Sequence, residues 1–135
     1  MMHTNKNDYI SLTDIARQFN QEGANDLVAF WLSERMTVEF LGLWEKENNP
    51  EFDTCAFDEI KLEAGRNGYI ITPKKWVDST KAIGFDVRGK QYFAHQDISL
   101  QFACWLSPLF KLYMIKTLNS GSNSAELVKA LGKIG

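Results

Sequence analysis

The chain has 135 residues, about the length of one domain, and 44% of them are hydrophobic, which favours a packed core over a disordered chain. No apolar run approaches the ~20 residues that span a bilayer, and the N-terminus has no hydrophobic region of the signal-peptide kind. Cys55 and Cys104 stand apart from any Cys or His at metal-ligand spacing, so free or buried thiols in a reducing cytoplasm are expected.

The charge of the chain is distributed unevenly. The formal net charge of −2 argues mildly against a nucleic-acid partner. Residues 39–63 hold eight acids against two lysines, a balance of −6, and are expected to form a solvated acidic face. Residues 64–116 hold eight bases against three aspartates, a balance of +5, so a basic region lies within a mildly acidic chain.

The first half of the chain predicts a loose tail at 1–7 followed by four helices. Apolar residues recur at helical spacing in four stretches, so helices are expected at 12–19, about 26–35, about 38–47 and about 56–64. The expected N-caps of the first three helices are Ser11, Asn25 and Thr37. Residues 69–71 are expected to be extended and to pair either with Tyr9-Ile10 or with a later hairpin.

The most informative stretch begins at Thr72 and predicts a helix at 73–83. Thr72 suits the N-cap, Pro73 suits the first helical position, and Gly84 suits the residue that follows a helix. Apolar residues fall on one face of this helix, whereas lysines fall on the other. The lysines on the expected solvent face are Lys74, Lys75 and Lys81.

A hairpin with a basic tip is expected directly after this helix. The apolar runs 85–87 and 92–94 flank a polar turn at 88–91 that carries two cations and an amide. A basic helix followed by a basic hairpin fits a DNA duplex through its groove and backbone together. An ordinary surface helix and turn is the alternative interpretation of the same residues.

The rest of the chain predicts two longer helices and a short one. The longer helices are expected at about 96–106 and 109–118, followed by a linker at 121–124 and a short helix at 125–134. Phe and Trp side chains at helical spacing are expected to form the core rather than a stacking platform. Helices dominate and strands are few and short, so the expected class is α+β, a mostly helical single domain with a short hairpin.

No group of residues predicts catalysis, and no metal or cofactor is expected. His3 and His95 lie 92 positions apart, and His95 is expected to cap a helix or stabilise a turn. The glycines of EAGRNG and VRGKQ lack the arrangement of a phosphate-binding loop. The acids of 39–63 lack a metal-ligand pattern such as the calcium loop. Hydrolytic or nuclease activity therefore has no supporting residues, and a function by binding is favoured.

Four segments resemble the KilA-N domain of phages and large DNA viruses. They are DYISLTDIAR, TVEFLGLWEKENNPEF, EAGRNGYIITPKKWVDSTKAIG and YFAHQDISLQFACWLSPLFKLYMIK. The resemblance implies a DNA-binding domain at 8–118, related to the fungal APSES domain, with a winged helix-turn-helix-like fold. A helix and a β-hairpin wing contact the duplex in that fold, so 73–83 would precede a wing at 84–94. Residues 119–135 would be a linker and a short C-terminal segment.

The chain departs from the resemblance in one helix and in its hairpin, which is shorter than the usual glycine-rich form. Many family members have a basic string similar to KNWMRNRNTIEF, whereas this chain has AFWLSERMTVEF at 29–40, with Arg35 as its only base. A DNA contact made by that helix in relatives is therefore expected to be weakened here. The stretch 72–95 would then have to supply most of the affinity.

The favoured hypothesis is a phage or prophage-derived cytoplasmic regulator that binds double-stranded DNA and performs no chemistry. The expected nucleic-acid contacts are Lys74, Lys75, Ser79, Lys81, Arg88, Lys90 and Gln91. The alternative is a protein-interaction module that binds a repressor or host regulator through the acidic region 39–63. No membrane partner is expected, and the sequence predicts neither the oligomeric state nor a DNA sequence preference.

Overall fold

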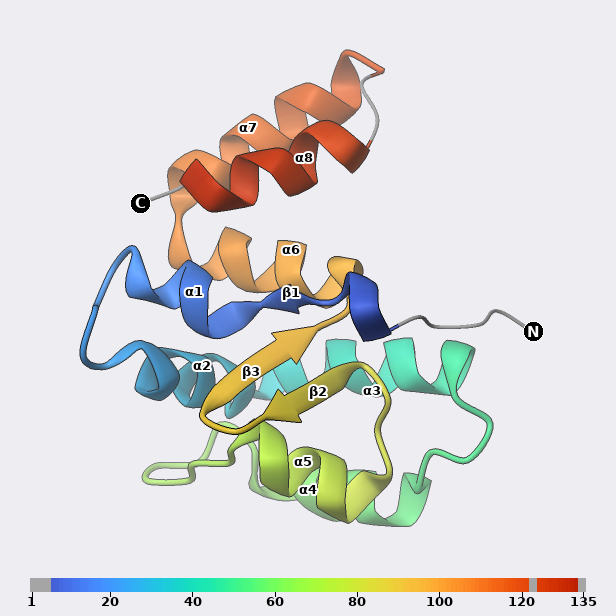
Figure 1. Cartoon of the computed structure of the whole chain (residues 1–135). Helices are drawn as coiled ribbons and strands as arrows, with labels where there is room; N and C mark the ends of the chain where they lie inside the picture. The colour runs from blue at the N-terminus through green and yellow to red at the C-terminus, as the bar shows by residue number, and fades with distance from the viewer. Residues whose placement is uncertain (1–5, 122–123, 134–135) are drawn as a thin grey trace.

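A three-stranded antiparallel sheet connects the N-terminus of the chain to its hairpin (Figure 1). The structure is a computed structural model that describes residues 6–121 and 124–133. Strand β1 (Ile10–Ser11) pairs with β3 (Gln91–Ala94), which also pairs with β2 (Phe85–Arg88), so the order is β1-β3-β2. Neither pairing expected for residues 69–71 forms, because Ile10 pairs with Ala94 of the hairpin itself.

Residues 69–71 are not a strand. The backbone N–H of Ile71 donates to Oγ of the buried Ser33 at 2.8 Å. A side chain of a neighbouring helix therefore satisfies the backbone that a strand would have paired.

Each predicted helix has a counterpart in the structure. The helices are α1 (Leu12–Arg17), α2 (Ala24–Leu32), α3 (Arg35–Asn48), α4 (Thr54–Glu63), α5 (Pro73–Thr80), α6 (Gln96–Leu106), α7 (Pro108–Asn119) and α8 (Ser124–Ala130). Two 3-10 turns, η1 (Lys6–Asp8) and η2 (Leu131–Lys133), lie near the ends. The expected tail at 1–7 therefore already contains the start of η1, while residues 1–5, 122–123 and 134–135 lie outside the described residues.

The expected caps are partly confirmed. Ser11 and Thr72 accept the backbone N–H groups of Asp14 and Lys75, and His95 caps α6 by accepting the N–H of Asp97 at Nδ1. The two remaining expected caps, Asn25 and Thr37, are wrong. Gly23 and Glu34 stand at the N-caps of α2 and α3, so Asn25 and Thr37 lie inside these helices and are free for tertiary contacts.

Aromatic side chains form the centre of the core, as the sequence predicts. Trp31 of α2 is fully buried, with its ring centroid 6.2 Å from that of Phe85 on β2 and 5.0 Å from that of Phe102 on α6. This cluster joins strand β2 to helices α2 and α6. Both cysteines are free, and Cys55 is exposed on α4.

The helices divide into two ends on opposite sides of the sheet (Figure 1). Helices α4 and α5 lie below the hairpin in that view, and α5 packs against both α4 and β2. Helices α7 and α8 lie above, on the far side of α6, and α6 contacts both of them. We call these the hairpin end (α5 and β2–β3) and the C-terminal end (α7, α8 and η2).

Candidate nucleic-acid interface

Helix α5 is held by a tryptophan that points away from its lysines. Trp76 is fully buried, and its ring centroid lies 5.9 Å from that of Phe52 and 6.1 Å from that of Phe57 on α4. Lys74 and Lys75 are exposed on the opposite side of the helix, as their spacing predicts. Ser79 is half-buried at the edge of this exposed face.

The helix ends three residues earlier than the sequence predicts. Lys81 is its C-cap and adopts a left-handed backbone with φ of 60°, so this lysine lies beyond the helical face. The carbonyl of Thr80 accepts from the N–H of Asp53 at 2.8 Å, and the carbonyl of Lys81 accepts from Nδ2 of Asn49 at 2.8 Å. These tertiary bonds replace the helical ones, so the expected range 73–83 is wrong at its C-terminus.

A buried glutamate fixes the segment between α5 and β2. Glu45 of α3 is 1% exposed, and its carboxylate accepts the backbone N–H groups of Ile83 at 3.0 Å and Gly84 at 2.8 Å. Asn49, one turn further along α3, donates to the same carboxylate at 3.0 Å. Burial raises the pKa of Glu45 above its ordinary value, although the hydrogen bonds from Ile83, Asn49 and Gly84 oppose the change.

Glu45 is the main residue that the sequence analysis missed, because it was assigned to a solvated acidic face. Val38, Leu41 and Glu45 follow one buried stripe of α3 at helical spacing, and this position is the signal that marks Glu45 as an interior residue. Gly84 was expected to follow the end of a helix, but the structure requires glycine there because of close packing. A Cβ at Gly84 would lie 2.5 Å from Cδ1 of Ile98 and 2.8 Å from Oε2 of Glu45, so the residue is a point of close packing rather than a helix end.

The hairpin tip is a two-residue turn. Arg88 and Gln91 are paired at the ends of the two strands, which leaves Gly89 and Lys90 as the loop. Gly89 has φ of 61°. Lys90 does not have positive φ, because Lys81 is the only described residue other than glycine that does. Positive φ at the first loop residue alone is the pattern of a type II′ turn, which continues the twist of the strands.

Side chains of α1 and α2 anchor this tip. Asn25 donates from Nδ2 to the carbonyl of Lys90 at 2.8 Å and accepts at Oδ1 from the hydroxyl of Thr13 at 2.8 Å. The same hydroxyl oxygen of Thr13 accepts the N–H of Tyr92 at 2.9 Å. Gln91 lies within 3.4 Å of Asp14 through its amide. The tip is therefore held on two sides, and no local sequence pattern predicts this.

The predicted cations differ in how far they are engaged. Nζ of Lys74 lies 2.8 Å from Asp78, which raises the pKa of this lysine. Arg88 contacts Asp86 at 2.7 Å and the carbonyl of Lys6 at 2.6 Å, and its guanidinium carbon lies 4.1 Å from the ring centroid of Phe93. Among the lysines predicted to contact DNA, Lys75, Lys81 and Lys90 form no ion pair with any other described residue.

The segment 29–40, in which Arg35 is the only base, contributes to packing. Ser33 is buried at the end of α2, where its hydroxyl donates to the carbonyl of Ala29 at 2.6 Å. Glu34 accepts from Nε1 of Trp105 at 2.9 Å, and the only base of the segment, Arg35, lies 3.4 Å from Glu39. These contacts serve the fold of the domain, and they leave α5 and the hairpin as the basic elements of this end.

The described residues contain neither a metal-ion cluster nor a helix that could cross a membrane. Within residues 6–121 and 124–133, no three His, Cys, Asp or Glu side chains gather where they could hold a metal ion. None of the helices in the described part of the chain is both long and apolar enough to cross a bilayer.

The sequence matches the KilA-N domain family over residues 1–123, nearly the whole chain. The protein therefore belongs to the KilA-N domain family, as the four motifs predict, and domains of this family are generally DNA-binding. No curated protein and no solved structure gives a significant match. The family thus indicates DNA as the class of ligand, but it assigns no contact to a particular residue of this chain.

Proposed function

We propose that this protein binds duplex DNA through the hairpin end, with α5 and the β2–β3 tip contacting the sugar-phosphate backbone and a groove. The observation that carries the proposal is the packing of α5, which holds Lys74 and Lys75, against β2, which leads into the basic tip. Asn25 and Thr13 hold the tip in place before DNA binds, so binding loses little conformational entropy at the tip.

Phosphate contacts are assigned first to the lysines that have no acidic neighbour. Lys75, Lys81 and Lys90 are exposed and carry no ion pair with another described residue. Lys74 and Arg88 join the contact when phosphate replaces Asp78 and Asp86, which is feasible because exposed ion pairs are weak in water. Ser79 and Gln91 supply hydrogen bonds to phosphate or base edges.

In this proposal the domain acts by binding alone, as a phage or prophage-derived regulator in the cytoplasm of a bacterial or infected host cell. The helix and hairpin would serve as the recognition helix and wing of a winged helix-turn-helix. A protein contact through the acidic region 39–63 is the weaker candidate, because Glu45 within it belongs to the core.

The test is a salt titration of duplex binding, because each neutralised phosphate contributes about −0.9 to the slope of log K against log salt. A slope of about −2.7 corresponds to the three unpaired lysines, and a slope of about −4.5 includes Lys74 and Arg88 as well. Asp78→Asn should raise the affinity a few-fold, because it removes a competing carboxylate and frees Lys74.

The decisive variant removes the three unpaired lysines together as Lys75→Ala, Lys81→Ala and Lys90→Ala. It should lower the affinity at least about tenfold and flatten the slope by about 2.7. The matched control removes the same number of charges from the C-terminal end as Lys111→Ala, Lys116→Ala and Lys129→Ala. Equal losses in the two triple variants would contradict the assignment of the hairpin end, since the effect would then come from net charge alone.

A further inference from the structure

The C-terminal end of the molecule exposes apolar side chains that the DNA-binding proposal does not use. Helix α7 buries Phe110 and Thr117 but leaves large apolar residues on its remaining surface. The exposed members are Leu109, Leu112, Tyr113, Ile115 and Leu118. A helix that is apolar on most of its circumference is normally covered on most sides. Helix α7 packs against α6 and has α8 beside it (Figure 1), and five of its large apolar side chains stay exposed.

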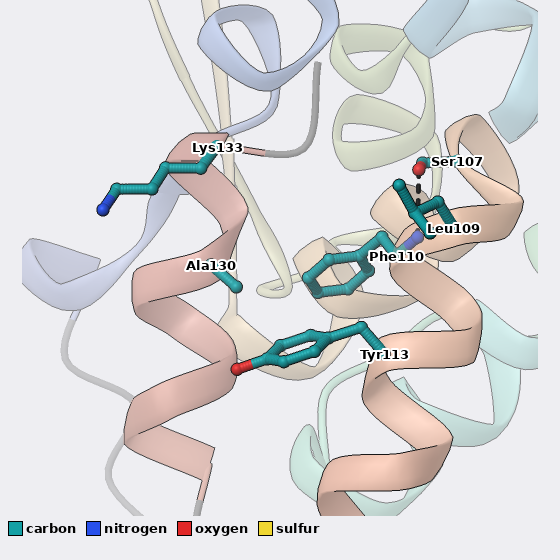
Figure 2. A pocket seen from close by; sticks show the side chains of 6 residues that line it. All are labelled: Ser107, Leu109, Phe110, Tyr113, Ala130 and Lys133. Carbon is teal, nitrogen blue, oxygen red and sulfur yellow. Dashed lines mark hydrogen bonds between the residues drawn. The ribbon is translucent and has the colours of Figure 1, made fainter.

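A groove of about 310 Å³ runs between α7 and α8, as Figure 2 shows. Phe110 and Tyr113 project from α7 toward α8, Ala130 faces them, and Lys133 extends away from the groove into solvent. A second hollow of about 290 Å³ shares Tyr113, Ala130 and Lys133 with the first. The second hollow adds Glu126 and Lys129 to the lining, so the apolar groove continues into a charged rim. Two adjoining hollows suit successive side chains of a helix better than a single side chain.

The groove lacks the polar groups that would orient a small molecule. The hydroxyl of Ser107 is already engaged, since it accepts the backbone N–H of Phe110 at 3.0 Å. The ammonium group of Lys133 lies at the rim and points outward (Figure 2). Sites for small ligands combine an apolar lining with several convergent polar groups, so apolar side chains of a protein fit this lining better.

The charge around the groove selects the partner. Residues 108–133 contain four lysines and a single acid, Glu126. The lysines are Lys111, Lys116, Lys129 and Lys133, all of them exposed and without an ion pair to another described residue. Two copies of this face placed together would bring like charges into contact, which disfavours a symmetric dimer here.

We propose that the groove between α7 and α8 receives an acidic amphipathic helix of a partner protein. Apolar residues of that helix at i, i+3 or i+4 and i+7 enter the two hollows, and its carboxylates face the four lysines. The groove lies on the far side of the sheet from α5 and the hairpin tip (Figure 1). The partner and a duplex therefore occupy opposite ends of one domain, and each binds without displacing the other.

The test uses the whole chain and a fluorescent peptide of about four helical turns, with leucine at i, i+4 and i+7 and glutamate at most other positions. Fluorescence anisotropy should show saturable binding, and a peptide with lysine in place of each glutamate should bind at least about tenfold more weakly. Reversing the rim with Lys129→Glu and Lys133→Glu should invert that preference. Absence of binding, or equal binding of the two peptides, would overturn the proposal.

A pair of matched variants separates docking from general stickiness. Leu109→Glu changes a groove residue that is 75% exposed, whereas Leu62→Glu makes the same change on α4 at a leucine that is 65% exposed. The first should weaken peptide binding at least about tenfold, and the second should leave it unchanged. Both should retain the melting temperature of the parent chain, because neither side chain is part of the core.

Other occupants of the groove give distinct results. Concentration-dependent self-association that Leu109→Glu abolishes would assign the groove to a second copy and overturn the proposal. Binding to phosphatidylserine vesicles that the same variant abolishes would assign it to a membrane surface and overturn it as well. Duplex affinity should be the same for the parent and for Lys129→Glu with Lys133→Glu, and a large loss would assign the lysines to DNA instead.

Discussion

At the hairpin end, Lys74 and Arg88 form ion pairs with Asp78 and Asp86, whereas the lysines of the C-terminal end form no ion pair with another described residue. The hairpin end has well-anchored elements and few exposed apolar side chains apart from Ile70 just before α5. The C-terminal end exposes a row of apolar side chains on one helix. A count of charges along the sequence does not separate these ends, since what differs is how far each cation is already engaged and what surrounds it.

The largest expected effect comes from the buried carboxylate that fixes the hairpin end. Glu45→Ala should lower the free energy of unfolding by about 3 kcal/mol, because Ile83, Gly84 and Asn49 lose their acceptor while buried. Chemical denaturation would measure this loss, and amide exchange would show the opening at 81–84. A protection loss at α7 equal to that at 81–84 would contradict the local role of Glu45.

The pH dependence of the same residue has a definite sign. Because burial raises the pKa of Glu45, the folded state binds the proton of this carboxyl group more tightly than the unfolded state does. Its contribution to stability is therefore complete at low pH and declines as the pH rises from about 4.3 through the folded pKa. The free energy of unfolding of the parent minus that of Glu45→Gln should fall over this interval, and a rise would contradict the prediction.

Packing at glycine gives the next largest effect. Gly84→Ala should destabilise the domain by about 1–3 kcal/mol, because the new methyl group meets Ile98 and Glu45. Gly42→Ala in α3 should do the same despite the better helix propensity of alanine, since its Cβ would overlap the ring of Phe57. Gly132→Ala is the control, because nothing lies within 4 Å of a Cβ there. Thermal denaturation of the three variants would compare these costs directly.

A smaller and more selective effect is expected from the anchor of the hairpin tip. Asn25→Ala removes the bonds to Lys90 and Thr13 and should cost about 1 kcal/mol of stability. It should also lower duplex affinity a few-fold, because the tip must then be ordered on binding. The control is Asn20→Ala, which removes an exposed bond within its own loop. Unchanged affinity in Asn25→Ala would show that the tip does not need its anchor, and would weaken the contrast between the two ends.

Local signals in the sequence predicted much of this fold. The caps at Ser11, Thr72 and His95 follow from side chains that bond the backbone within three residues, and such contacts are visible in a short window. The exposed face with Lys74 and Lys75 follows from helical periodicity in the same way. The KilA-N motifs added the family, and the match over residues 1–123 confirms it.

The remainder depended on contacts between distant parts of the chain. The early end of α5 arises because Asp53 and Asn49 take the carbonyls of Thr80 and Lys81, which no pattern within 73–83 contains. The anchoring of the tip joins positions 65 residues apart, from Asn25 to Lys90. Charge counts also treated every lysine as equally available, although the i,i+4 spacing of Lys74 and Asp78 is a local signal that separates Lys74 from Lys75.

At position 81 the left-handed backbone favours glycine, whereas the proposed DNA contact requires a lysine side chain. A side chain with a Cβ pays roughly 1 kcal/mol in this conformation, and glycine avoids that cost while losing part of the gain through its greater freedom when unfolded. Lys81→Gly should therefore fold as well as the parent and still bind DNA more weakly. A variant of that kind cannot lose affinity by unfolding, so it would isolate the work of one charge from the integrity of the fold.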